Sequence, residues 1–96
     1  MLPNGTRRLG SANGRPKVMD YPDLNRLAVF YTLVNQGTMS KASQQLFITQ
    51  PAISAHIKAL EQRLGVTLFD RAGRGSVVSS AGRVLYEKAE HLFSVA

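Results

Sequence analysis

The sequence predicts a mainly α-helical domain in which three helices form the core, a two-stranded hairpin follows, and a longer helix comes last. Three observations predict it. Apolar residues recur at spacings of three and four in three successive stretches, two short β-prone runs flank a glycine-rich segment, and a narrow apolar stripe ends the chain. Because 96 residues can bury one small core, we expect a single domain over residues 20–79 and a helix over residues 80–96.

The net charge is +6, and its distribution is uneven. Residues 1–19 hold four arginines and lysines and no acid, whereas residues 20–96 hold eight against six acids. The domain itself is therefore only mildly basic, which favours polyanionic partners weakly. Residues 1–19 lack apolar periodicity and are predicted to be disordered. They are either a natural basic extension that touches DNA phosphates or a vector-derived or misassigned upstream segment, with Met19 as an alternative start.

Several classes of protein are disfavoured by composition. Without cysteine, neither a disulfide scaffold nor a thiolate metal site can form. The two histidines, His56 and His91, are far apart and have no carboxylate or nucleophile partner by motif, so we expect no enzyme, no metal and no cofactor. The longest apolar run is too short to cross a bilayer and no signal peptide is evident, so we expect a cytoplasmic protein.

The first helix is predicted over residues Asp23 to Gln36. Pro22 and Asp23 are typical of a helix start, and Gly37 is typical of a helix end. The apolar residues that repeat at helical spacing are Leu24, Leu27, Phe30, Tyr31 and Val34. They indicate a buried face rather than a binding groove.

A short second helix follows, and a third begins soon after it. Ser40 is the expected cap of the second helix, with Ala42 and Leu46 inward. The expected outward residues are Lys41, Gln44 and Gln45. Residues 47–49 alone separate it from the next helix, which predicts a helix-turn-helix whose second helix is presented outward. The turn lacks the glycine that is often found there.

The third helix is predicted from Thr49 to Gly65, and the chain is organised around it. Thr49 can cap it, Pro51 suits its first turn, and Gly65 can take a left-handed conformation at its end. The residues expected to face the core are Ile53, Ile57, Leu60 and Leu64. The residues expected to face outward are Pro51, Ser54, Ala55, Lys58 and Gln62. The small side chains near its start allow close approach to a surface, and its free N–H groups favour a phosphate.

A hairpin is predicted after this helix. Its β-prone runs contain Val66, Leu68 and Phe69 on one side and Val77 and Val78 on the other. Between them a Gly-Arg-Gly tip carries Arg74. The arginine is either simply solvated or belongs to a wing that reaches a minor groove or a phosphate. The glycines are too few, and lack the lysine, for an ATP-binding loop.

The last helix starts after Ser79, which can cap it. Its narrow stripe, with Val84 and Phe93 beside it, consists of Ala81, Leu85, Ala89, Leu92 and Ala96. Packing on so small a domain explains this stripe poorly, so we expect the helix to pair with the same helix of a second chain. Part of the stripe could still pack on the first helix.

These segments together resemble the N-terminal DNA-binding domain of the LysR-type transcriptional regulators, from Leu24 to about Leu92. The motifs that carry the resemblance occur in a fixed order over most of the chain. They are Leu24, Leu27 and Phe30, Gly37, Ser40 to Leu46, Thr49 to Ser54, Ile57, Leu60-Glu61, Leu64-Gly65, Leu68-Phe69 with Arg71, and Ala81-Gly82.

The resemblance implies a winged helix-turn-helix, with a three-helix core and a two-stranded wing, followed by a linker helix that dimerises as an antiparallel pair. It implies sequence-specific binding to double-stranded promoter DNA as the module of a bacterial transcription regulator. Base-reading roles fall on Gln50, Pro51, Ala52, Ser54 and Ala55, and backbone contacts on Lys41, Thr49 and Lys58. Arg74 enters the adjacent minor groove. Dimerisation falls on Leu85, Ala89, Leu92 and Ala96.

Three departures from the family pattern are visible. Position 55 is often arginine in the family and is Ala55 here, which removes one polar contact and offers a methyl group to a thymine. Ser43 stands where alanine is commoner, and Val78-Ser79 replaces the usual Leu-Thr. The two-lobed effector domain of the family is not in this sequence. We therefore expect a coinducer, and tetramer formation, only in a longer form.

One alternative class stays open besides DNA binding. A winged-helix protein-interaction module would use the last helix and the wing to bind a partner. It would need a large apolar patch on the outer face of the helix over residues 50–65, and the sequence places none there.

Overall fold

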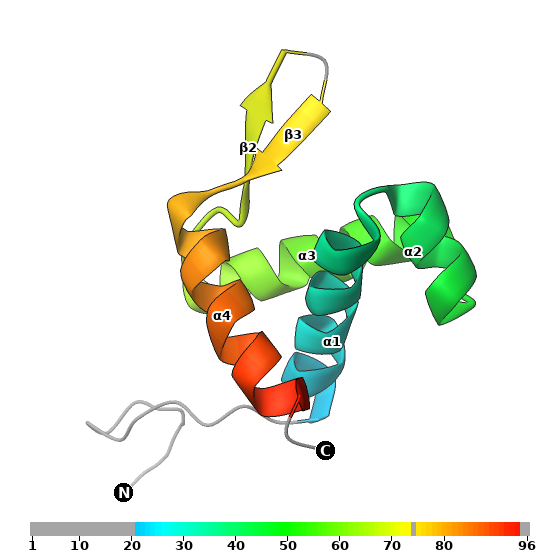
Figure 1. Ribbon diagram of the computed structural model, residues 1–96, viewed down its shortest axis with the longest axis horizontal. Helices are drawn as coiled ribbons and strands as arrows, with labels where there is room; N and C mark the ends of the chain where they lie inside the picture. The colour runs from blue at the N-terminus through cyan, green and yellow to red at the C-terminus, as the bar shows by residue number, and fades with distance from the viewer. Residues whose placement is uncertain (1–20, 74, 95–96) are drawn as a thin grey trace, which may run out of the picture.

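The computed structural model describes residues 21–73 and 75–94, and in these ranges the chain forms a helical body from which one hairpin projects (Figure 1). The elements are α1 (Tyr21–Gln36), α2 (Met39–Leu46), α3 (Gln50–Leu64), β2 (Phe69–Ala72), β3 (Gly75–Val78) and α4 (Ser80–Ser94). The predicted fold, a winged helix-turn-helix followed by a further helix, is confirmed. Predictions for residues 1–19, Arg74 and Ala96 lie outside the described residues.

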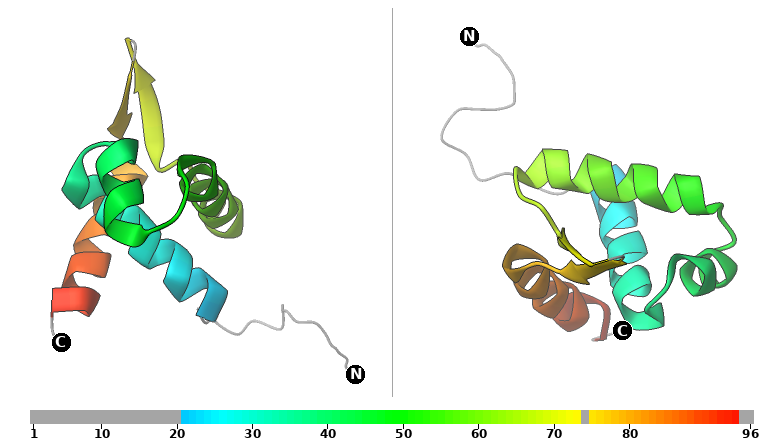
Figure 2. Two further views of the ribbon diagram at one scale, coloured as in Figure 1. Left: turned by 90° about the vertical axis from the view of Figure 1, so that its right-hand side faces the viewer. Right: turned by 90° about the horizontal axis from the view of Figure 1, so that it is seen from above.

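Helix α1 is central, because it packs against α2, α3 and α4. Figure 2 shows α3 and α4 on different sides of it. The core is built where these helices meet, and most of the sequence pattern is confirmed there. Its buried apolar residues are Leu27, Val29, Phe30, Ala42, Ile53, Ile57, Leu60, Leu68 and Ala89. Phe30 contacts Phe69 at the base of the hairpin edge to face, with ring centroids 5.6 Å apart.

Helix ends follow local chemistry, with one correction. Gly37 ends α1 with φ +85° and donates its N–H to Leu33 O at 2.9 Å. The predicted cap of α2 at Ser40 is wrong. Thr38 has extended backbone and its hydroxyl accepts the Lys41 N–H at 3.1 Å, so the helix begins at Met39 and already contains Ser40.

Helix α3 has the predicted caps. The Thr49 hydroxyl accepts the Ala52 N–H at 3.2 Å, and Gly65 adopts φ +71° while donating its N–H to Glu61 O at 2.7 Å. The predicted burial of Leu64 is wrong, since its side chain is 41% exposed. The chain turns at Gly65 directly after it, and the fully buried Leu68 supplies the apolar side chain on the way to the hairpin.

The wing is the antiparallel hairpin of β2 and β3. Phe69 pairs with Val78, and Arg71 pairs with Ser76. Val66 and Leu68 lie before the strand rather than in it, which shortens the predicted run. Only the pair at the base, Phe69 and Val78, is partly buried among the described residues of the two strands. The wing therefore has almost no core of its own.

Polar contacts hold the base of the wing to α4. Ser79 donates its N–H to Leu68 O at 2.9 Å and its hydroxyl to Thr67 O. The same hydroxyl accepts the Gly82 N–H at 2.9 Å, so the predicted cap at Ser79 is confirmed. Gly82 has no room for a side chain, because a Cβ there would lie 2.4 Å from Leu68 O. Helix α4 can approach the hairpin this closely only because position 82 is glycine.

Helix α4 packs on α1 more extensively than predicted. Ala89 is fully buried, and Leu85 and Phe93 pack against the core, so the expectation that the stripe is poorly explained by the domain is wrong. The rings of Tyr31 and Tyr86 stack at 5.3 Å, and the Tyr86 hydroxyl donates to Asn35 Oδ1. Burial raises the pKa of the Tyr86 phenol above its ordinary value, and the charge of Glu90 acts in the same direction.

Candidate nucleic-acid interface

The outer face of α3 is small, polar and exposed near its N-terminal end. Gln50, Pro51, Ser54 and Ala55 are all exposed, while Ile53 on the opposite side is fully buried. Ala52 is half-buried, so of the predicted base-reading residues it lies closest to the core. No large side chain blocks this surface, so a macromolecule can approach the backbone of the first two turns.

Backbone donors and cations surround this face. The first turn of a helix has free N–H groups and carries partial positive charge. The Thr49 hydroxyl accepts a hydrogen bond from one of these donors, the Ala52 N–H. It therefore has less capacity to accept a second hydrogen bond from a ligand. Lys41 and Lys58 are both exposed, one from α2 and one from α3. The arrangement favours an anionic partner.

The turn between α2 and α3 is closed by two devices that sequence reasoning did not foresee. Phe47 takes the left-handed conformation that glycine often has in such turns, with φ 58°, and its side chain is 92% exposed. The Ser43 hydroxyl donates to Ile48 O, a bond that the commoner alanine could not make. Ser43, which departs from the family pattern, thus ties the second helix to the turn that follows it.

A groove separates α3 from the wing. It is lined on the α3 side by Ser54 and Lys58 and on the wing side by Arg71 and Ser76. Arg83 of α4 and the acids Glu61, Glu87 and Glu90 also line it, so the groove has mixed charge, with a cation on each side. Arg71 was not predicted as a site residue. The sequence pattern that could have identified it is the two-residue period of a strand, which puts Arg71 on the same face of β2 as Phe69.

Glu61 joins α3 to the wing. Its carboxylate accepts the Leu68 N–H at 2.8 Å, just before β2 begins. Leu68 is fully buried, so without Glu61 this donor would lack that acceptor in an apolar setting. Glu61 therefore sets the position of the hairpin relative to α3.

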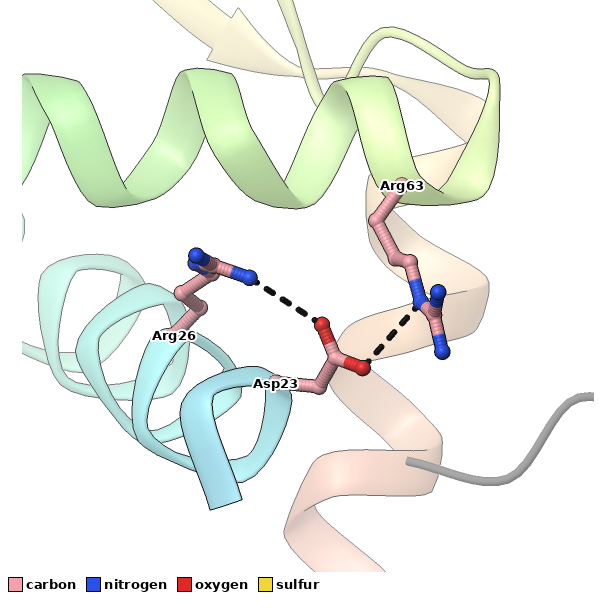
Figure 3. A network of polar contacts seen from close by, with 3 residues as sticks. All are labelled: Asp23, Arg26 and Arg63. Carbon is pink, nitrogen blue, oxygen red and sulfur yellow. Dashed lines mark hydrogen bonds and ion pairs between the residues drawn. The ribbon is translucent and has the colours of Figure 1, made fainter. Parts of the chain in front are cut away.

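Asp23 joins the first turn of α1 to the last turn of α3 (Figure 3). Its carboxylate is bound by Arg26 at 3.2 Å and by Arg63 at 3.1 Å. The sequence indicated Asp23 only as a helix start signal. The pairing with Arg63 has no local signal, because the two residues are 40 positions apart in the chain.

Other kinds of site find no support in the described ranges 21–73 and 75–94. No group of three or more histidine, cysteine, aspartate or glutamate residues there could hold a metal ion. No helix in the same ranges is both long and apolar enough to span a membrane. The exposed part of α3 carries polar or small side chains apart from Leu64 at its end, so it lacks the large apolar patch of a protein-interaction module.

Known proteins match most of the chain. Residues 24–83 match the family model described as bacterial regulatory helix-turn-helix protein, lysR family. An uncharacterized HTH-type transcriptional regulator of Azotobacter vinelandii is 45% identical over 73 residues, which is 76% of this chain and 51% of that protein. The HTH-type transcriptional activator AmpR of Rhodobacter capsulatus is 42% identical over 77 residues, covering 78% of this chain and 27% of AmpR.

Solved structures match the fold as well. A DNA complex of the BenM DNA-binding domain with catB site 1 aligns with TM-score 0.68 and 34% identity, over 74% of this chain and 76% of that one. The LysR family transcriptional regulator CbnR aligns with TM-score 0.68 and 32% identity, over 75% of this chain and 25% of that one. A DNA complex of the CbnR DNA-binding domain aligns with TM-score 0.67. The chain spans about half the length of the first of the two regulators and about a quarter of AmpR.

Proposed function

Because this chain belongs to the lysR family of bacterial regulatory helix-turn-helix proteins, we propose that α3 reads operator DNA from the major groove while the wing enters the adjacent minor groove. One observation carries the proposal. The exposed face of α3 is small and polar at its N-terminal end, whereas its opposite face is anchored by Ile53, Ile57 and Leu60. A helix anchored in this way can lie against base edges without disturbing the core.

Base reading falls on the first two turns of α3. Gln50 and Ser54 donate to and accept from base edges, and Pro51 and Ala52 allow the helix to lie close to them. Ala55 has no hydrogen-bonding group, so it contributes apolar contact with a thymine methyl. We expect the preferred operator to carry a thymine where relatives with arginine at this position prefer guanine.

Contacts with the DNA backbone fix the register. Lys41, Lys58 and the backbone at Thr49 approach phosphates beside the major groove. Arg71 reaches the same strand from the wing side of the groove. Arg74, which lies outside the described residues, keeps its predicted role in the minor groove. Salt bridges to phosphates release counterions, so affinity falls steeply as salt rises.

A second copy of the chain binds through α4. Val84 and Leu92 are 54% and 51% exposed, so α4 leaves these two apolar side chains outside the core for a second chain to cover. Leu85 and Ala89 pack within the domain itself, so they are less accessible to a second chain than the sequence predicted. Two domains joined in this way present two α3 helices to a palindromic site. Regulation of transcription, and any response to a small coinducer, belong to the longer regulator.

Selection from a random duplex library, sequenced after binding, tests the proposal directly. We expect enrichment of one palindromic sequence. Gln50→Ala then relaxes base choice, so it weakens binding to the selected duplex more than binding to a scrambled duplex. Equal losses on both duplexes would remove Gln50 from the reading role. Lys58→Ala is the matched variant, and it weakens both duplexes alike while lowering the salt slope by about 1.

A further inference from the structure

We propose that Asp23 fixes the direction of α3 through Arg63, and thereby sets how well the protein discriminates among DNA sequences. The proposal rests on the proposed function of α3 as the reading helix. Neither residue lies on the reading face, so Asp23 and Arg63 are positioning residues. Their effect on DNA is transmitted through the orientation of the helix.

The carboxylate of Asp23 uses each oxygen for a different arginine (Figure 3). Oδ1 accepts from Arg26 Nη1 at 3.2 Å, one turn along the same helix. Oδ2 accepts from Arg63 Nε at 3.1 Å, in the last turn of α3. One oxygen therefore binds within α1, and the other ties α1 to α3. The side chain of Asp23 is only 2% exposed, whereas those of Arg26 and Arg63 are 30% and 39% exposed.

We expect an ion pair of this kind to restrain the orientation of α3 more than it adds to the net stability of the fold. A carboxylate that is removed from water needs cations and hydrogen bonds to compensate for its lost hydration. The cost of this desolvation offsets most of the Coulombic attraction between the carboxylate and its arginines. What remains is geometry, since a charge-assisted hydrogen bond weakens when its atoms move out of line. The contact also joins complementary helix ends, because Asp23 lies in the first turn of α1 and Arg63 in the last turn of α3.

In the last turn of α3, Glu61 is tied to the base of the wing through the Leu68 N–H, whereas Arg63 is tied to the start of α1. Ile53, Ile57 and Leu60 anchor the first and middle turns of α3, but Leu64 in the last turn is 41% exposed. Apolar burial is non-directional and tolerates a small swing about the middle of the helix. Gln50 lies seven residues before Ile57 in the chain. At about 1.5 Å per residue this lever is about 10 Å long, so a swing of about 10° moves Gln50 by about 2 Å. Base contacts need placement within about 0.5 Å.

Arg26 provides a matched control within the same network. It binds the same carboxylate through its own guanidinium, but it belongs to α1, so this ion pair does not tie α1 to α3. If Asp23 acted only as a buried charge in need of neutralisation, loss of either arginine would have similar consequences. If it acts by holding α3, only loss of Arg63 changes the reading helix.

The first test uses DNA binding by the 96-residue chain. Affinities for the duplex selected by the wild-type protein and for a scrambled duplex are measured for Arg63→Gln and Arg26→Gln. We expect Arg63→Gln to lower the ratio of the two affinities at least fivefold and Arg26→Gln to change it less than twofold. A direct phosphate contact by Arg63 would instead weaken both duplexes equally and lower the salt slope by about 1, which would overturn the proposal.

The second test needs no DNA. Backbone residual dipolar couplings report the orientation of α3 relative to α1 in the free protein. We expect a changed orientation in Arg63→Gln and the wild-type orientation in Arg26→Gln. Unchanged couplings in Arg63→Gln would overturn the proposal whatever the binding results. If Arg63→Gln does not melt cooperatively, Arg63→Lys takes its place, because it keeps the charge but loses the planar guanidinium. If the wild-type chain binds neither duplex, the proposed function fails, and the couplings still decide the role of Asp23.

Discussion

Helix α3 and the wing flank the same groove, but they are held in different ways. Three buried apolar side chains anchor α3, namely Ile53, Ile57 and Leu60. The wing has a partly buried pair only at its base, and beyond that pair its described side chains are exposed. Helix α3 is thus part of the core, whereas the wing is an appendage positioned by the polar contacts of Glu61 and Ser79. Damage to the wing base should therefore be separable from damage to α3.

The largest expected loss of stability comes from a substitution in the buried face of α3. Leu60→Ala removes a fully buried side chain and leaves a cavity. We expect it to lower the free energy of unfolding by about 3 kcal/mol. Val77→Ala, on the wing at 52% exposure, should change it by less than about 0.5 kcal/mol. Urea titrations followed by circular dichroism measure both. Similar losses for the two variants would mean that the wing is as firmly packed as α3.

The next effect breaks the base of the wing. An alanine at position 82 would place its Cβ 2.4 Å from Leu68 O and 2.7 Å from Val78 Cγ1. We expect Gly82→Ala to lower the free energy of unfolding by about 2 kcal/mol. The same substitution at an open position in a helix would raise it by about 1 kcal/mol. Gly75→Ala is the control, since nothing lies within 4 Å of its Cβ. Thermal denaturation distinguishes the two, and a gain in stability for Gly82→Ala would show that α4 shifts freely.

A smaller loss of stability is expected when the hydrogen bond between α3 and the base of the wing is removed. Glu61→Ala leaves the buried Leu68 N–H without its carboxylate acceptor, so we expect a loss of about 1.5 kcal/mol. Hydrogen exchange at Leu68 should accelerate more than exchange in the middle of α3. Glu61→Gln keeps an oxygen acceptor and should lose less than about 1 kcal/mol. If exchange rose equally along α3, the wing and the helix would form one cooperative unit.

The smallest effect concerns α4, which docks on α1 partly through Tyr86. The pKa of Tyr86 is raised in the folded protein by burial first and Glu90 second, so the folded state keeps its proton at pH values where the unfolded state loses it. The resulting stability is complete below the ordinary tyrosine pKa, about 10, and is lost as pH rises beyond it. We expect Tyr86→Phe to flatten this alkaline decline. Chemical denaturation at pH 8 and pH 11 measures it, and an identical decline in both proteins would contradict the assignment.

Elements and caps set by neighbouring residues could be predicted from the sequence. Thr49, Gly65 and Ser79 act within three or four residues of their partners, so their local chemistry identified them. Leu64 was misassigned, because helical periodicity gives a face but not where the neighbouring helix ends. Thr38 was overlooked as the cap of α2, since Ser40 nearby has equally suitable chemistry.

Contacts between distant segments could not be predicted. The pairing of Asp23 with Arg63 depends on where the start of α1 meets the end of α3, and no period or motif encodes that meeting. The sequence left open whether Ala89 packs on α1 or on a second chain, since a small apolar residue suits both contacts equally. For the candidate interface, the sequence identified the exposed face of α3. Arg71 was overlooked, although the two-residue period of its strand puts it on the same face as Phe69.

The two faces of α3 share no side chain. The residues that hold it, Ile53, Ile57 and Leu60, are buried, and Gln50, Ser54 and Ala55 are exposed. Mutations can therefore accumulate on the outer face without loss of folding, so a duplicated gene could acquire a new target sequence in single steps that each leave a viable protein. The same separation lets an engineer exchange the outer residues as a cassette.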